Sequence, residues 1–431
     1  MLIALKMNNC FIYNSEVTFS MRADMRYKRF SNNVSSYGNS NILKTAIVIG
    51  PNNAGKTNLI KCISALKKIM LNSKSSALLK HLFSDSSVCE LSATFLEDDK
   101  EYVFEVKYDT KTREYLYERF AHITYDQYKN KKEIDIIVRD NISQSYFCEE
   151  DDVVKAMRIA AKNNILIYLL DTEQFEVLEN VKKIIVSFAS KIDIVDMNDI
   201  DVKKTIKFLK EPSDMQKRIV DFIRNADVSL DDYKYLNDDE VKINLGNVES
   251  ENPVPQEKVL RVSESIVEML HLTSVYKGMQ VPSLVYDSTG TKKMIAIASY
   301  VIDAIENGRI LIVDELDNSL HFKLTRAIIT LFNNDLNKKA QLICTVHDVS
   351  LLDCKKLFRK EQIWFAHKDR DNAYLYSLSE FTIENDGIRD TSDIVQKYKS
   401  GIFGALPDPD LFQSLMEVHT NVKSADIIDE T

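Results

Sequence analysis

Glycine is scarce in this sequence, which has only ten glycines among its 431 residues. The six cysteines show neither paired spacing nor a CxxC motif, which excludes the disulfide framework of a small secreted protein. No apolar run reaches the roughly 18 residues of a membrane-spanning helix, and the first residues lack the pattern of a signal peptide. We therefore expect a reduced, cytoplasmic protein that has no membrane partner.

An excess of positive charge is also missing. The formal net charge is −9 at pH 7, which argues against a protein dedicated to coating DNA. A small basic cluster near the N-terminus is interpreted as a solvated loop; it consists of Arg22, Arg26, Lys28 and Arg29. With 45% hydrophobic residues, the chain can bury a sizeable core.

Two of the ten glycines lie in the stretch GPNNAGKT at residues 50–57, which fits the pattern G-x-x-x-x-G-K-[ST]. An apolar run precedes it and apolar residues at helical spacing follow it, as expected for a loop between a strand and a helix. Backbone N–H groups of such a loop wrap the phosphates of a nucleotide. The predicted nucleotide contacts are Gly50, Asn52, Asn53, Ala54, Gly55, Lys56 and Thr57. Among these, Lys56 would reach the β- and γ-phosphates and Thr57 would bind Mg²⁺.

Two later strands are predicted to end in residues that suit the hydrolysis of ATP. RILIVDEL at residues 309–316 ends in adjacent carboxylates, which are costly at the end of a buried strand unless they serve a charged ligand or cation. Asp314 would hold Mg²⁺ through its water shell, and Glu315 would orient or deprotonate the attacking water. His347 ends a neighbouring strand, where it can contact the γ-phosphate. Glu315 and His347 are the predicted catalytic residues.

A second phosphate-binding surface is predicted where STGT, residues 288–291, opens a helix that ends at Gly308. Small hydroxyl residues and a glycine at a helix N-terminus can bind phosphate without a lysine. Since the chain already has a phosphate loop, Ser288 and Gly290 would meet the γ-phosphate held by another subunit. The alternative is an ordinary helix N-cap.

The periodicity divides the chain into three regions. Residues 1–147 are mostly strand-like, residues 148–257 are helical and then acidic, and residues 258–431 alternate strands and helices. We predict an α/β fold with a mostly parallel core sheet, flanking antiparallel strands and a helical insertion over 148–257. The insertion lacks histidine, and its single cysteine is Cys148 at its first position, which excludes an HNH nuclease site and a paired-cysteine zinc hook. Its run DIVDMNDID could hold Mg²⁺, but a solvated connection between helices is favoured.

The ordered set of motifs resembles the ATP-binding-cassette (ABC) ATPase heads that include SMC, RecF and the OLD-like enzymes. GPNNAGKT, DSTGTKK, IVDELDNSLH and TVHDVSLLD are most similar to the stand-alone OLD-related AAA ATPases of bacterial antiphage defence, such as AbiLi and the ATPase subunits of PARIS and Septu. The resemblance covers residues 1 to about 125 and 284 to 408. It implies an ABC-type head with a Walker A motif in the first region and the signature, Walker B motif and switch histidine in the last.

Roles and partners follow from this resemblance. Lys56 and Thr57 resemble the family's phosphate and Mg²⁺ contacts, and Asp317 resembles the loop aspartate at its dimer interface. The family likeness implies an Mg²⁺-dependent ATP hydrolase that forms a homodimer or higher homo-oligomer through ATP-bound heads. It also implies a separate effector, a nuclease or toxin, and a trigger such as nucleic acid or a phage protein.

Two other functions stay open at the level of sequence. A RecF-like DNA-binding ATPase of repair or maintenance would show a salt-sensitive DNA affinity that rises with ATP. A scaffold that binds ATP without turnover would keep its properties when Glu315 is replaced. The insertion has no sustained heptads, which excludes a long SMC-type arm.

Overall fold

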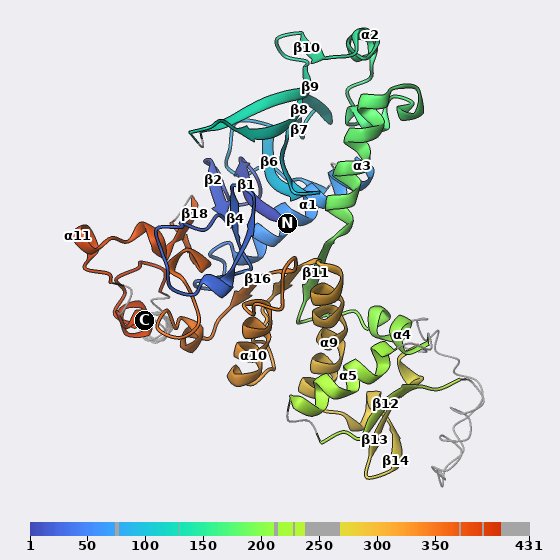
Figure 1. Ribbon diagram of the computed structural model, residues 1–431, viewed down its shortest axis with the longest axis vertical. Coiled ribbons are helices and arrows are strands. Elements are labelled where there is room, and N and C mark those ends of the chain that lie inside the picture. The colour runs from blue at the N-terminus through green and yellow to red at the C-terminus, as the bar shows by residue number, and fades with distance from the viewer. Residues whose placement is uncertain are drawn as a thin grey trace, which may run out of the picture.

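A six-stranded sheet, parallel except for one edge strand, lies at the centre of the computed structural model (Figure 1). The structure describes residues 1–73, 77–128, 130–210, 214–226, 229–237, 268–369, 372–389 and 392–406. In spatial order the strands are β11 (Ile192–Asp196), β15 (Ile310–Asp314), β16 (Gln341–Val346), β5 (Thr45–Ile49), β17 (Ile363–Lys368) and the antiparallel β18 (Ala373–Ser377). Strands β15, β16 and β5 are buried along their whole length, which explains their continuous apolar runs.

A seven-stranded antiparallel sheet lies next to this central sheet. Its order is β10 (Ser145–Cys148), β9 (Lys131–Asp140), β8 (Glu114–Tyr125), β7 (Lys100–Asp109), β6 (Val88–Glu97), β1 (Leu2–Asn8) and β2 (Val17–Ser20). Helix α1 (Lys56–Asn72) shares one hydrophobic core with β1, β6 and the central strands. Helix α3 (Glu176–Ser190) joins the same core, where Phe188 stacks on Phe95 with 4.1 Å between ring centroids.

The other face of the central sheet is covered by α9 (Thr289–Asn307) and α10 (Phe322–Phe332). Met294, Ile297 and Val301 of α9 pack in one core with Leu311 and Val313 of β15. This is the apolar stripe that the helical spacing predicts. The shorter described elements are β3 (Val34–Tyr37), β4 (Ser40–Leu43), α2 (Asp151–Ile159), α8 (Ser283–Tyr286), α11 (Ile383–Asp386) and α12 (Ile394–Lys399).

A satellite lobe packs on the outer side of α9 (Figure 1). It consists of α4 (Lys203–Lys210), α5 (Asp214–Asn225) and a sheet of β12 (Asp232–Tyr235), β13 (Leu272–Tyr276) and β14 (Met279–Pro282). Its core is shared with Ile295 and Ala298 of α9. Helix α9 therefore contacts the central sheet on one side and the satellite lobe on the other.

The predicted α/β class is confirmed, with a mainly parallel sheet, flanking antiparallel strands and helices in the predicted insertion. One interpretation is wrong: the acidic run at 193–201 is not a connection between helices, because β11 pairs in parallel with β15. Ile192 and Val195 are buried there, while the charge of Asp193 is paired with Lys204 and Arg309. The boundary at 147/148 stays a prediction, and the one at 257/258 lies outside the described residues, as do most of the acidic loop and the C-terminal tail.

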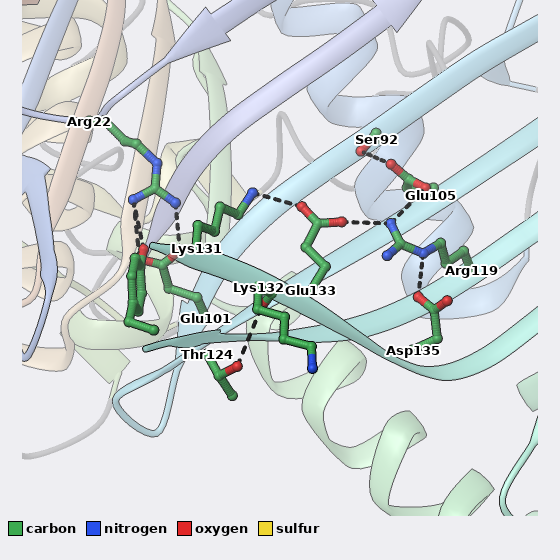
Figure 2. Close-up of polar contacts among 11 residues, drawn as sticks. Arg22, Ser92, Glu101, Glu105, Arg119, Thr124, Lys131, Lys132, Glu133 and Asp135 are labelled. Carbon is green, nitrogen blue, oxygen red and sulfur yellow. Dashed lines mark hydrogen bonds and ion pairs between the residues drawn. The ribbon is translucent and has the colours of Figure 1, made fainter. Parts of the chain in front are cut away.

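Ion pairs cover the antiparallel sheet (Figure 2). Arg119 on β8 donates to Glu133 at 2.8 Å and to Asp135 at 2.6 Å, both on β9. Arg22 pairs with Glu101 on β7, with 2.5 Å between Nη2 and Oε2, so this member of the predicted basic cluster is bound to an acidic partner. Arg26 pairs with Asp24. No helix among the described residues is long and apolar enough to cross a bilayer.

A buried ion pair fixes the end of this sheet. Arg139 on β9 is fully buried and donates to Glu118 at 3.0 Å and to the carbonyl oxygen of Ala160 at 3.2 Å. Burial raises the pKa of Glu118, which Arg139 opposes. We expect Arg139→Met to lower the free energy of unfolding by about 3–5 kcal/mol, because it leaves a buried carboxylate without its cation. Urea denaturation measures this loss.

The matched control for Arg139→Met is Lys155→Ala, because Lys155 also pairs with an acid, Asp152, but in full contact with solvent. Exposed pairs of this kind contribute little to stability, so the control should unfold as the wild type does. Equal stability of both variants would contradict the prediction.

Candidate nucleotide-binding site

The loop between β5 and α1 has its glycines where a side chain does not fit. A Cβ atom at Gly50 would lie 2.1 Å from the carbonyl oxygen of Ala366 on β17. Gly55 has φ +110°, and a Cβ there would lie 2.8 Å from Cδ1 of Ile12. The carbonyl of Gly55 accepts a hydrogen bond from the Tyr13 hydroxyl at 3.0 Å, and this support was not predicted from the sequence. The strand, loop and helix therefore occur in the order that the motif predicts.

The remaining loop residues divide into exposed and buried groups. Asn52 and Asn53 are exposed, and Asn53 has a left-handed backbone with φ 62°, a conformation that asparagine tolerates better than most residues. Ala54 is buried. Thr57 lies in the first turn of α1 with its side chain exposed, so its hydroxyl is free to meet a ligand at the positive end of the helix.

Lys56 is folded back onto its own loop. Its ammonium donates to the carbonyl oxygens of Gly50 at 2.7 Å and Pro51 at 3.0 Å, and the residue is only 6% exposed. Burial lowers the pKa of Lys56, and the carboxylates of Glu315 and Asp314 oppose this shift. The lysine thus lies near the acidic end of β15, as the phosphate-binding hypothesis requires.

The ends of β15 and β16 are joined by one threonine. Thr345 donates its hydroxyl to Oδ1 of Asp314 at 2.5 Å and accepts from the backbone N–H of Glu315 at 2.7 Å. Asp314 is buried, with 7% of its surface exposed. Glu315 has a left-handed backbone, φ 55°, which is costly for a glutamate and is often found at functional sites. The Asp314 carboxylate is therefore buried against Thr345, whereas the Glu315 side chain is partly exposed.

The Glu315 carboxylate lies among three polar side chains. Its Oε2 accepts from Asn198 at 3.0 Å and from Asn318 at 3.1 Å, and its Oε1 lies 3.5 Å from Nε2 of His347. The hydrogen bond from Asn198, followed by those from Asn318 and His347, holds the pKa of Glu315 below its ordinary value. The carboxylate is thus ionised at neutral pH and can accept a hydrogen bond from water.

Asp317 contacts the turn that carries His347. Its Oδ2 accepts from the backbone N–H of His347 at 2.7 Å and of Asp348 at 2.6 Å. The sequence interpretation assigned Asp317 to a subunit interface, and that role stays a prediction. Within the chain, Asp317 links the turn after β15 to the turn after β16.

Ser288 is the N-cap of α9 and accepts from the backbone N–H of Thr291 at 3.1 Å, as the N-cap alternative predicts. Its side-chain hydrogen bonds within the described residues stay in this turn, and Ser288 is exposed. A Cβ at Gly290 would lie 3.0 Å from the carbonyl oxygen of Ser319. The start of α9 therefore packs on the turn after Glu315 and leaves the Ser288 side chain outward.

The residue before this cap is a buried acid. Asp287 accepts hydrogen bonds from Ser274 and Ser283 at 2.5 and 2.6 Å, and from Tyr276 at 2.6 Å. Ser274 and Tyr276 belong to β13, so the start of α9 is tied to the satellite lobe.

The donor set fits Mg²⁺ held together with a nucleotide. Asp314 and Thr57 supply hard oxygen atoms, and Mg²⁺ commonly takes one or two protein ligands plus water and phosphate oxygens. No group of three or more His, Cys, Asp or Glu side chains that could hold a metal occurs in the part of the chain that the structure describes. A metal at Asp314 would take its remaining oxygen ligands from water and from a bound nucleotide.

The sequence did not predict three residues that support the site: Tyr13, Asn198 and Thr345. Thr345 had a signal, because it lies two residues before His347 on a strand that neighbours β15. Asn198 had none, because its place depends on the unpredicted strand β11.

Comparison with known proteins finds one family model and several solved structures that are similar to this chain. A family model described as "AAA domain, putative AbiEii toxin, Type IV TA system" matches residues 46–353. No curated protein matches the chain in sequence. Among solved structures, the SMC head domain from Thermotoga maritima has 10% identity and a TM-score of 0.42, covering 87% of this chain and 98% of that chain. An SMC head with an extended coiled coil, bound to the C-terminal domain of ScpA derived from Pyrococcus furiosus, has 11% identity, a TM-score of 0.41 and coverages of 92% and 99%.

Proposed function

This chain belongs to the AAA-domain family whose model covers residues 46–353, and from that premise we propose that it is the ATP-driven switch subunit of an antiphage defence system. ATP binding and hydrolysis are general to such ATPases. The observation that carries the ATPase part of this proposal is the arrangement of Lys56, Glu315 and His347, in which a lysine of the phosphate loop lies near an oriented carboxylate and a histidine. The switch role rests on family analogy.

The chain's own residues account for binding and orientation of ATP. Backbone N–H groups of residues 50–57 and the Lys56 ammonium would bind the phosphates, exchanging the carbonyl contacts of the lysine for phosphate oxygens. Thr57 and Asp314 would hold Mg²⁺, which offsets the charge that develops on the phosphates. Asp314 is kept in place by the Thr345 hydroxyl.

Glu315 would orient the attacking water, because its carboxylate is ionised and its Oε1 faces His347. His347 would contact the γ-phosphate, and Asp317 would keep the His347 turn in position.

Each site would be completed by a second subunit. Ser288 and Gly290 lie at the N-terminus of α9 with the Ser288 side chain exposed, so a partner's γ-phosphate is a suitable ligand for this positive end. Two heads would then close face to face on two ATP molecules, and hydrolysis would open them. This opening would release or activate a separate nuclease or toxin, which is a proposal by family analogy.

We expect Lys56→Ala and Ser288→Arg to be inactive alone and to restore turnover when mixed. A mixed dimer contains one site with an intact phosphate loop from one subunit and an intact signature from the other. Random mixing should recover about a quarter of the wild-type rate, since about half the dimers are mixed and each has one complete site. Two inactive variants that stay inactive at every ratio, although they form dimers, would contradict the shared site.

The switch role is tested by purifying wild type and Glu315→Gln from the native cell with ATP present. Recovery of a stoichiometric nuclease or toxin, bound more tightly by the variant, would support it. Recovery of nucleic acid alone, lost at moderate salt, would instead favour a RecF-like DNA-binding ATPase.

A further inference from the structure

Asn198 lies outside every motif, yet its side chain reaches the predicted catalytic carboxylate. We propose that Asn198 is a positioning residue whose amide holds Glu315 in the orientation needed for hydrolysis. The inference rests on the proposed ATPase function and names a residue, from the predicted insertion, on which the rate depends.

The pairing of β11 with β15 brings Asn198 to this place. Asp196 lies opposite Asp314 in the parallel register, and the backbone N–H of Met197 donates to the carbonyl oxygen of Asp314 at 3.1 Å. The backbone N–H of Asn198 donates to Oδ1 of Asp196 at 2.8 Å, which fixes the turn. Since both strands end at the same edge of the sheet, Asn198 and Glu315 follow them side by side.

Two amides then restrain one carboxylate oxygen. Asn198 donates to Oε2 of Glu315 at 3.0 Å, and its own Oδ1 accepts from Asn318 at 2.6 Å. Asn318 also donates to Oε2 at 3.1 Å, which closes a triangle of hydrogen bonds. Oε1 faces His347 and is left to accept a hydrogen bond from the attacking water. The two amides thus occupy Oε2 and leave Oε1 to orient the attacking water.

The hydrogen bond between Asn198 and Glu315 contributes little to the stability of the fold. Asn198 and Asn318 are not buried, so water could satisfy their amides and no desolvated group depends on the triangle. The Glu315 side chain is 30% exposed and would sample several rotamers without these donors. Misplacing a catalytic group by about 1 Å can cost about 10²-fold in rate.

The test compares Asn198→Ala and Asn198→Asp with the control Asp199→Ala. Asp199 is the next residue of the same turn, and its exposed side chain makes no hydrogen bond within the described residues. We expect Asn198→Ala to lower kcat by about 10- to 100-fold. Asn198→Asp should lower it at least as much, because a second carboxylate would face Glu315. KM for ATP, the equilibrium affinity for a fluorescent ATP analogue and the thermal unfolding midpoint should stay at wild-type values.

Each other outcome overturns the inference in a different way. If Glu315→Gln is inactive but Asn198→Ala keeps the wild-type kcat, the positioning role is wrong and the ATPase function stands. If KM and the analogue affinity change while kcat does not, Asn198 contacts the nucleotide instead. If Glu315→Gln hydrolyses ATP at the wild-type rate, the proposed catalytic site is wrong and the role of Asn198 fails with it.

Discussion

Glu315→Gln should lower kcat for ATP hydrolysis by about 10²- to 10⁴-fold, the range usually contributed by a general base. The amide keeps the size of the side chain but cannot accept the proton of the attacking water. ATP affinity should stay the same or increase, because a negative charge near the phosphates is removed. Steady-state phosphate release gives kcat, and equilibrium binding of a fluorescent ATP analogue gives the affinity.

A suitable control for this variant is Glu384→Gln on α11, which removes an exposed carboxylate without touching the site. It should hydrolyse ATP as the wild type does. The variant also offers a second readout, since blocked hydrolysis should keep the subunits associated for as long as ATP is bound. A wild-type rate for Glu315→Gln, with the fold intact, would favour an ATP-binding scaffold that does not depend on this carboxylate.

Lys56→Ala is expected to have the largest effect on nucleotide binding. Hydrogen bonds to charged groups contribute about 1.5–3 kcal/mol each, so the loss of the ammonium should weaken MgATP binding by at least about 10- to 150-fold. Isothermal titration calorimetry measures the Kd directly.

Lys61→Ala is the matched control, because Lys61 is exposed on the same helix and lies outside the phosphate loop. Thermal unfolding of both variants should be recorded, since Lys56 also bonds to two loop carbonyls in the free protein. Unchanged affinity of a folded Lys56→Ala protein would mean that the loop does not bind the phosphates of ATP.

The strands of the central sheet were predictable where burial on both faces produces continuous apolar runs. This holds for β5, β15 and β16, which were all expected as strands. β11 was missed because only Ile192 and Val195 of its five residues are fully buried. The charge of Asp193 is paired with Arg309, 116 positions away, and a pairing of that range leaves no local signal.

In the candidate site, the residues at the ends of apolar strands could be predicted, whereas those placed by long-range contacts could not. Lys56, Asp314, Glu315 and His347 each follow or end an apolar strand, and parallel strands bring such residues to one edge. The contact of Asn198 with Glu315 spans 117 positions and depends on the register of β11. The roles of Ser288 and Gly290 depend on a second subunit, so they stay predictions that the mixing experiment tests.

Helix α9 lies between the central sheet and the satellite lobe and contacts both. Its apolar residues are divided between the central sheet and the satellite lobe, and Asp287 fastens its first turn to β13. A ligand that shifted the satellite lobe would displace Ser288 and so alter the affinity for ATP from a distance. By thermodynamic reciprocity, ATP would alter the affinity for that ligand by the same factor. The satellite lobe is therefore the region where an allosteric effector of this ATPase should be sought.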